Sequence, residues 1–346
     1  MLDDALTAAL LAGKVAALAR AVSIVENGRP GYEELLATLH PRLGRARRIG
    51  LTGPPGAGKS TLTERLVTAY RVQGLRVAVV AVDPTSPFTG GALLGDRIRM
   101  ESVALDPGVY IRSMATRGSL GGLATATREV CDVLDAAGFE RIIVETVGVG
   151  QSELDVTRMA DTTALILVPE SGDGIQTLKS GIIEAADLFV VNKADRPGAD
   201  KLRRELEMSL DLRSGRMSRP VPAHHGALRS GPPKRPAEDV ADPTVWRPPV
   251  LVTTASKGDG IEAVIDALEA HWLWLVASGA LEQRRRTRLA ERTREVVERA
   301  MRRWVWQEAH ADEMITARLD DVSVGRTSPY ELAADIVAAL KEGARV

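Results

Sequence analysis

The sequence predicts an α/β fold built on a doubly wound, mostly parallel sheet, with helical extensions at both ends. From about residue 47, short apolar segments alternate with stretches at helical spacing, and several of these segments contain no polar residue. Unbroken apolar strands are typical of sheets that helices cover on both faces. A glycine-rich loop between the first strand and a helix is the third observation. The expected strands are residues 48–52, 77–82, 109–114, 142–147, 164–168, 188–191 and 250–253.

The segments outside the sheet have helical character. Apolar residues recur at helical spacing over residues 5–26, which we expect to form one helix, and a second short helix is expected at 32–39. Further along the chain, a helix is expected at 261–276 and a charged amphipathic helix at 281–309. Near the end, Ser328, Pro329 and Glu331 match an N-cap, a first-turn proline and a capping-box glutamate.

These patterns divide the chain into three parts. Residues 1–44 form an N-terminal helical extension, 45–278 the sheet domain, and 279–346 a C-terminal helical region. Residues 213–249 are rich in Pro, Arg, Ser and Gly without periodicity, so we expect a surface insertion inside the sheet domain.

Composition excludes several classes of protein. The formal charge of −1 over 346 residues shows no basic excess, so we expect no sequence-independent binding of nucleic acid. No apolar run is long enough for a membrane span, and the chain begins with acidic Asp3 and Asp4, so we expect no membrane association and a cytoplasmic protein. Cys131 is the single cysteine, which excludes an internal disulfide and a C-x-x-C pair.

The glycine-rich loop matches the phosphate-binding pattern G-x-x-x-x-G-K-[S/T] in full. It reads G-P-P-G-A-G-K-S from Gly53 to Ser60, between an expected strand and an expected helix. The glycines let successive backbone N–H groups curl around a phosphate at the positive end of the helix. Lys59 can reach the β and γ phosphates, and the Ser60 hydroxyl can ligate Mg²⁺. The predicted phosphate contacts are Gly53, Pro54, Pro55, Gly56, Ala57, Gly58, Lys59, Ser60 and Thr61.

A second motif selects the base. Asn192-Lys193-Ala194-Asp195 follows an apolar strand, as N-K-x-D does in proteins that bind guanine. A carboxylate at Asp195 can accept from the ring N–H and the amine of guanine, whereas adenine offers neither donor. The predicted base contacts are Asn192, Lys193 and Asp195, with a second loop at Thr254, Ala255 and Ser256 in which the Ala255 backbone N–H is available to the guanine carbonyl.

Acidic residues near strand ends are candidates for a metal site. Asp83, Asp96 and Glu145 could each hold Mg²⁺ directly or through a water, together with Ser60, although Asp96 fits the first turn of a helix equally well. Gly148 is placed to direct its backbone N–H to the γ-phosphate. We therefore predict that Lys59, Glu145 and Gly148 take part in hydrolysis.

With these residues assembled, the chain resembles the MeaB/ArgK family of GTPases. Beyond the P-loop, the resemblance rests on A-L-A-R-A-V-S-I-V-E-N at 17–27, on the runs at 82–100 and 145–153, and on 171–187, which leads into V-V-N-K-A-D. The resemblance implies a P-loop GTPase domain of the SIMIBI class, GTP or GDP with Mg²⁺ as ligands, and a homodimer formed through the C-terminal helices. It also implies a chaperone that gates cofactor loading and protects or reactivates the adenosylcobalamin-dependent methylmalonyl-CoA mutase.

The resemblance further implies a switch loop at residues 170–179. The chain departs from the family pattern at Glu170, at Thr254 and in the length of the insertion, none of which removes a phosphate or base contact. Two alternatives use a similar fold: a metallochaperone GTPase, for which His224 and His225 are the one adjacent histidine pair, and an ArgK-like kinase of transport proteins. The lack of a cysteine pair argues against the first, and the N-K-x-D motif argues for a switch over a kinase.

Overall fold

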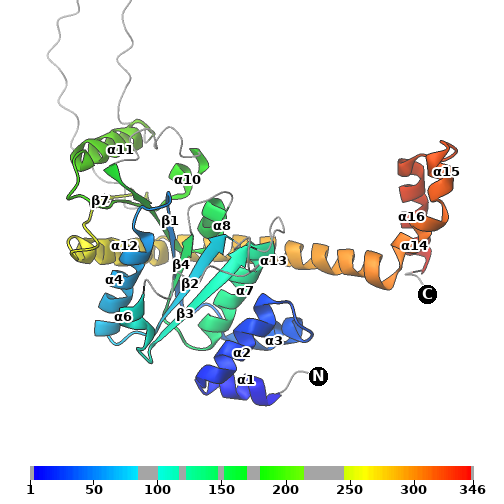
Figure 1. The fold of residues 1–346 in the computed structure, drawn as a ribbon, viewed down its shortest axis with the longest axis horizontal. Coiled ribbons are helices and arrows are strands. Elements are labelled where there is room, and N and C mark those ends of the chain that lie inside the picture. The colour runs from blue at the N-terminus through cyan, green and yellow to red at the C-terminus, as the bar shows by residue number, and fades with distance from the viewer. Residues whose placement is uncertain are drawn as a thin grey trace, which may run out of the picture. The chain divides into compact units, whose positions relative to one another are not determined.

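The predicted parallel sheet is present. The structure is a computed structural model that describes residues 4–84, 100–116, 122–146, 152–169, 180–213 and 245–343. Within them, one sheet has the strand order β3-β2-β4-β1-β5-β6-β7, and every neighbouring pair is parallel (Figure 1). The strands are β1 (Arg47–Thr52), β2 (Val77–Pro84), β3 (Val109–Thr116), β4 (Arg141–Thr146), β5 (Thr162–Leu167), β6 (Leu188–Val191) and β7 (Val250–Val252).

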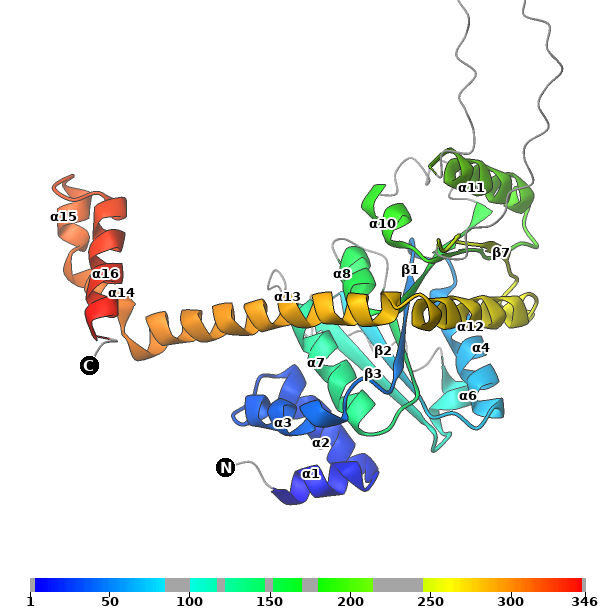
Figure 2. The ribbon, with the colours of Figure 1, turned by 180° about the vertical axis from the view of Figure 1, so that it is seen from behind.

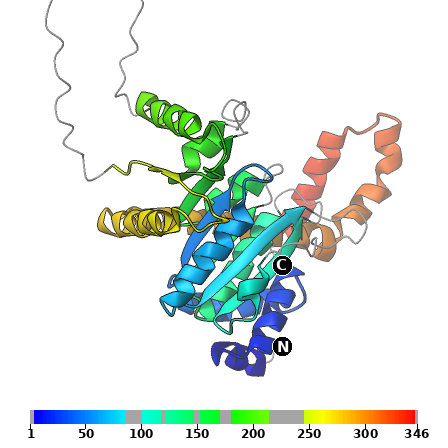
Figure 3. The same cartoon turned by 60° about the vertical axis from the view of Figure 1, so that its left-hand side comes forward.

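Helices cover both faces of this sheet, which explains the unbroken apolar strands. Successive side chains of a strand point to opposite faces. In β2, Val77 and Val79 accordingly pack in one buried cluster, and Ala78 and Val80 in another. The first cluster is covered by α4 (Lys59–Val72), α6 (Glu101–Ala104) and α12 (Ile261–Ala277), and the second by α7 (Gly122–Ala136) and α8 (Ser152–Met159). Figure 3 shows α4 lying along the sheet. Near β5 and β6, a third cluster involves α10 (Ser180–Ala185) and α11 (Ala199–Arg213).

The N-terminal segment forms three helices, of which the second and third pack on α7 and the first packs on the second. These are α1 (Asp4–Leu11), α2 (Val15–Glu26) and α3 (Tyr32–Leu39), followed by a single 3₁₀ turn, η1 (His40–Arg42). The prediction of one helix over 5–26 is wrong. Gly13 adopts φ 77°, the left-handed conformation that ends helices, and the chain restarts at Val15. The break lets both helices bury apolar faces, with Leu10 of α1 and Val22 of α2 in the same cluster.

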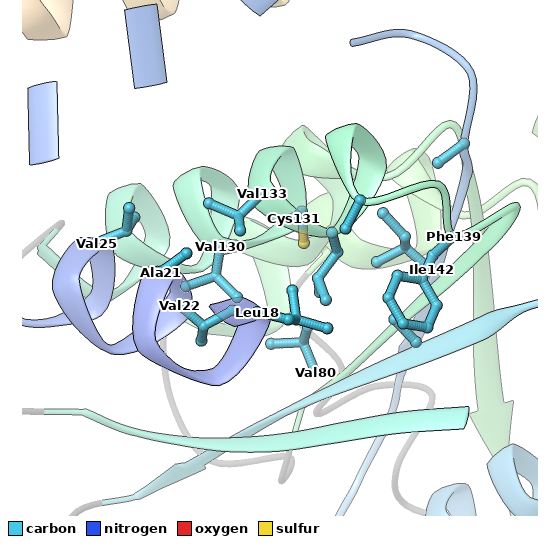
Figure 4. Packing of buried hydrophobic residues seen from close by; sticks show 14 of the residues in the cluster. Leu18, Ala21, Val22, Val25, Val80, Val130, Cys131, Val133, Phe139 and Ile142 are labelled. Atoms are coloured by element: carbon cyan, nitrogen blue, oxygen red, sulfur yellow. The ribbon is translucent and has the colours of Figure 1, made fainter. Parts of the chain in front are cut away.

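Cys131 of α7 belongs to this cluster (Figure 4). The same cluster contains Leu18 and Ala21 of α2 and Val80 of β2. Burial raises the pKa of its thiol to about 12, so the side chain acts as a small apolar residue.

The chain between the N-terminal helices and the sheet is fixed by a buried carboxylate. Asp135 of α7 accepts hydrogen bonds from the backbone N–H groups of Gly44, Arg45 and Ala46, at 2.8, 3.2 and 2.9 Å. Arg48, the second residue of β1, donates to Asp132 one turn earlier on α7 at 2.7 Å. These contacts set the position of β1 and therefore of the loop that follows it.

The chain divides into two compact units, residues 1–281 and 282–346. In the second unit, the buried residues Ala311, Leu332 and Ile336 form a small core. The amphipathic helix expected over 281–309 is α13, which ends at Arg303 and is followed by a π-helical turn. The elements from here on are α13 (Ala280–Arg303), η3 (Trp304–Glu308), α14 (Ala311–Ala317), α15 (Leu319–Ser323) and α16 (Pro329–Gly343), which Figure 2 shows from behind.

The predicted capping box at the start of α16 is confirmed. The Glu331 backbone N–H donates to Ser328 Oγ at 3.2 Å, and the Ser328 backbone N–H donates to Glu331 Oε2 at 2.8 Å. No single helix among the described residues has the length and apolar character of a membrane span; one bent pair, α12 with residues 280–308, meets both criteria together.

Candidate nucleotide site

The P-loop follows the central strand β1 at the carboxyl edge of the sheet, where doubly wound folds bind ligands. Two of its glycines have a positive φ and no room for a Cβ atom. Gly53 has φ 142°, and a Cβ there would lie 2.1 Å from the Ile166 carbonyl oxygen of β5. Gly58 has φ 88°, and a Cβ would lie 2.4 Å from Asn192 Nδ2. The loop is thus pressed against β5 on one side and against the N-K-x-D motif on the other.

Lys59 is the first residue of α4, and its side chain is buried within the loop. Its Nζ donates to the carbonyl oxygens of Gly53 and Pro54 at 2.8 and 2.9 Å. The ammonium group is therefore bonded to the first two residues of the loop, directly after β1, and its charge lies near the start of α4. A cation beside the positive end of a helix favours an anionic ligand at this point.

Ser60 contacts the carboxylate that ends β4. Its Oγ donates to Glu145 Oε1 at 2.6 Å, and Thr63 Oγ1, one turn further along α4, donates to Glu145 Oε2 at 2.8 Å. Glu145 is 4% exposed. Both carboxylate oxygens thus accept from α4, so the P-loop helix and the end of β4 form one hydrogen-bonded unit.

These residues fit a Mg²⁺ ion in a specific way. The Ser60 proton is directed to Glu145, so the lone pairs of the Ser60 oxygen are free to face a cation on the other side. Mg²⁺ prefers such hard oxygen ligands and keeps several waters. Glu145 would add negative charge near the ion and orients its expected ligand Ser60. When bound, the ion would neutralise charge on the β and γ phosphates.

Three predicted residues cannot be placed. Asp83 lies near the end of β2, the strand adjacent to β4, and the structure describes its backbone but not its side chain. Asp96 and Gly148 lie outside the described residues, as do the switch loop at 170–179 and the histidine pair His224 and His225. Their roles remain predictions.

The N-K-x-D loop follows β6 at the same edge of the sheet. Lys193 adopts φ 57°, an unusual backbone for a side chain larger than glycine, and the Ala194 N–H donates to the Thr253 carbonyl at 3.0 Å. The Asp195 carboxylate is partly exposed and lies 3.5 Å from Lys257 Nζ. It is thus accessible to the donors of a guanine base.

Asn192 joins the two motifs. Its buried side chain donates from Nδ2 to the Ala57 carbonyl of the P-loop at 2.8 Å. Its Oδ1 accepts from Thr253 Oγ1 at 3.0 Å and from the Ala255 backbone N–H at 3.1 Å. The structure therefore differs from the expectation that the Ala255 N–H is available to guanine: this group is bonded to Asn192.

Sequence reasoning missed three residues of this network. Thr63, Thr253 and Arg65 each bond a predicted site residue. Only Thr63 had a signal, because it lies one helical turn after the P-loop lysine and serine and so shares their face. Thr253 and Arg65 had no such positional signal, and only the fold brings each of them to its partner.

Through Asn192 the phosphate loop and the loop that carries Asp195 become one surface. A surface of this kind on a parallel α/β sheet defines the class of P-loop GTPases.

Comparison with known proteins agrees and identifies the family. The family model described as methylmalonyl Co-A mutase-associated GTPase MeaB matches residues 18–310. A putative GTPase of Pyrococcus abyssi is 46% identical over 294 residues, covering 85% of this chain and 83% of that protein. The mitochondrial methylmalonic aciduria type A homolog of Mus musculus is 36% identical, over 82% of this chain and 66% of that protein. The chain belongs to the MeaB family and is a GTPase.

A solved structure agrees in fold over the full length. The crystal structure described as LAO/AO transport system kinase has a TM-score of 0.66 and 28% sequence identity, and the match covers 99% of both chains. The resemblance to this family and the predicted fold class are therefore confirmed.

Proposed function

We propose that this GTPase acts as a chaperone of an adenosylcobalamin-dependent methylmalonyl-CoA mutase, gating cofactor loading and protecting or reactivating the enzyme. The name of the family model supports the partner. The observation that carries the mechanism is the hydrogen bond of 2.6 Å between Ser60 and Glu145.

That bond connects nucleotide state to the segment after β4. A Mg²⁺ ion on the Ser60 oxygen would polarise the hydroxyl that donates to Glu145 and strengthen this hydrogen bond, so loss of the ion would weaken the contact between Ser60 and Glu145. The residue after Glu145 is Thr146, whose Oγ1 donates to Thr52 Oγ1 at 3.2 Å, next to the P-loop. A partner that contacts the residues after Thr146 would then sense GTP and GDP differently.

This chain would promote hydrolysis by positioning the nucleotide and by placing positive charge beside its phosphates. The P-loop amides and Lys59 would hold the phosphates, and Ser60, oriented by Glu145, would hold the metal. Asp195 selects guanine by accepting from its ring N–H and amine.

We also propose a homodimer formed through the C-terminal helices. No residue of α13 is buried, and its apolar residues Leu289, Val296, Val297 and Met301 are 39–54% exposed. An amphipathic helix without a buried face requires a partner to cover its apolar residues, and a second copy supplies an identical helix.

The test is hydrolysis of GTP by the purified chain with and without the cobalamin-dependent mutase from the same source. We expect slow hydrolysis alone and a severalfold higher rate with the mutase, with ATP not used. The Lys59→Ala variant should lose hydrolysis in both conditions. An unchanged rate in the presence of the mutase would contradict the chaperone proposal without touching the GTPase assignment.

The same samples distinguish the alternatives. Transfer of the γ-phosphate to a protein would favour the kinase, which the name of the LAO/AO structure suggests. Among the described residues no group of three or more His, Cys, Asp or Glu side chains could hold a metal ion, and the metallochaperone alternative therefore has no described site behind it.

A further inference from the structure

Arg65 connects the P-loop helix to the second base-contacting loop. It lies on α4, six residues after Lys59. Its Nε donates to the Ala255 carbonyl at 3.0 Å, and its Nη2 donates to the Ser256 carbonyl at 2.8 Å. A guanidinium group is planar and rigid, so two such bonds fix both the position and the tilt of the loop.

These bonds orient one particular peptide group. The Ala255 carbonyl and the Ser256 N–H belong to the same trans peptide plane, in which C=O and N–H point in opposite directions. Because Arg65 holds the carbonyl toward α4, the Ser256 N–H is directed away from α4. Within the described part of the chain this N–H makes no hydrogen bond, whereas the Ala255 N–H is bonded to Asn192.

We propose that Arg65 is a positioning residue for base recognition: it aims the Ser256 N–H at the 6-oxygen of guanine. The proposal rests on the assignment of guanine as the base. It gives the second loop a defined donor in place of the Ala255 N–H. Asp195 reads the ring N–H and the amine of the base, and Ser256 reads the oxygen beside them.

The nucleotides GDP, IDP and 2-aminopurine riboside diphosphate test this contact when each is compared with its own affinity for wild type. GDP and IDP carry the 6-oxygen and the ring N–H, whereas the 2-aminopurine nucleotide lacks both and so cannot report a change in the Ser256 contact. In the Arg65→Ala variant we expect GDP and IDP to bind about fivefold more weakly, the effect of one hydrogen bond, and the 2-aminopurine nucleotide to bind within twofold of wild type. Arg65→Lys should lie between the two, because lysine keeps the charge but not the fork.

Arg71→Ala is the matched control. Arg71 also lies on α4 and also donates to a backbone carbonyl, that of Leu75 at 2.7 Å, and to the Asp106 side chain at 3.0 Å, away from the base loop. It should leave all three affinities unchanged, while thermal unfolding without nucleotide reports any general loss of stability in either variant.

The outcomes are distinct. If the wild-type chain does not bind GDP, the guanine assignment fails and this inference with it. If wild type binds GDP but Arg65→Ala binds all three nucleotides as wild type does, or weakens all three equally, the positioning role alone is overturned.

Discussion

At the scale of single residues, Asn192 connects the phosphate loop to the base-binding loops. Its side chain makes three hydrogen bonds, to the P-loop, to Thr253 just before the second base loop and to the Ala255 N–H within that loop. Gly58 leaves the space for it, because a Cβ at Gly58 would lie 2.4 Å from Asn192 Nδ2. A buried amide that loses such partners costs free energy comparable to several hydrogen bonds.

Two glycine variants of the P-loop test this contact. Gly56→Ala and Gly58→Ala both place alanine at a positive φ, 73° and 88°, but a Cβ at Gly56 meets nothing within 4 Å. We expect Gly56→Ala to lower the free energy of unfolding by about 1 kcal/mol from backbone strain. Gly58→Ala should lower it by about 2 kcal/mol more, because Asn192 must move. Denaturant unfolding without nucleotide measures both. Equal losses would show that the contact with Asn192 is unimportant.

At the scale of elements, local sequence signals that involve only nearest neighbours were reliable. The capping box of Ser328 and Glu331 depends on four consecutive residues, and it forms as predicted. The prediction of one helix over residues 5–26 was wrong because the apolar periodicity continues past Gly13 and gives no sign of a break. The left-handed turn at Gly13 is set by tertiary packing, which buries Leu10 and Val22 in the same cluster.

The capping box has a pH dependence with a defined direction. The hydrogen bond from the Ser328 backbone N–H, followed by that involving its side chain, lowers the pKa of Glu331 below the ordinary value of a glutamate. Its contribution to stability is therefore complete above the ordinary pKa of the unfolded chain and is lost as the pH falls through the lower, folded-state pKa. We expect Glu331→Gln to speed hydrogen exchange across residues 328–343 at pH 6, with the difference from wild type shrinking at pH 3.

Exchange is compared with wild type at the same pH, so the intrinsic pH effect cancels. Glu342→Gln removes the same charge from the last turn of α16, outside the cap, and should not speed exchange at pH 6. If the two variants behaved alike, charge rather than the cap would explain the effect.

At the scale of the whole molecule, the proposed dimer is the property to test. In light scattering we expect twice the mass of the 37.1 kDa chain. Val297→Glu should give the monomer, because it places a charge within the exposed apolar residues of α13. Arg302→Glu adds the same side chain five residues on, about 140° around the helix, and should leave the dimer intact. A wild-type monomer at micromolar concentration would contradict the proposal.

The sequence by itself determined the parallel sheet, the P-loop and the N-K-x-D motif. Their signals are runs of neighbouring residues: unbroken apolar strands, three glycines before Lys59, and Asp195 just past a strand. Only the tertiary structure decided how these parts act together. Glu145 faces Ser60 across 85 positions, and Arg65 faces Ala255 across 190. Such pairs arise from strand order and helix packing, which bring distant segments to one edge of the sheet, and no local pattern encodes which side chains meet there.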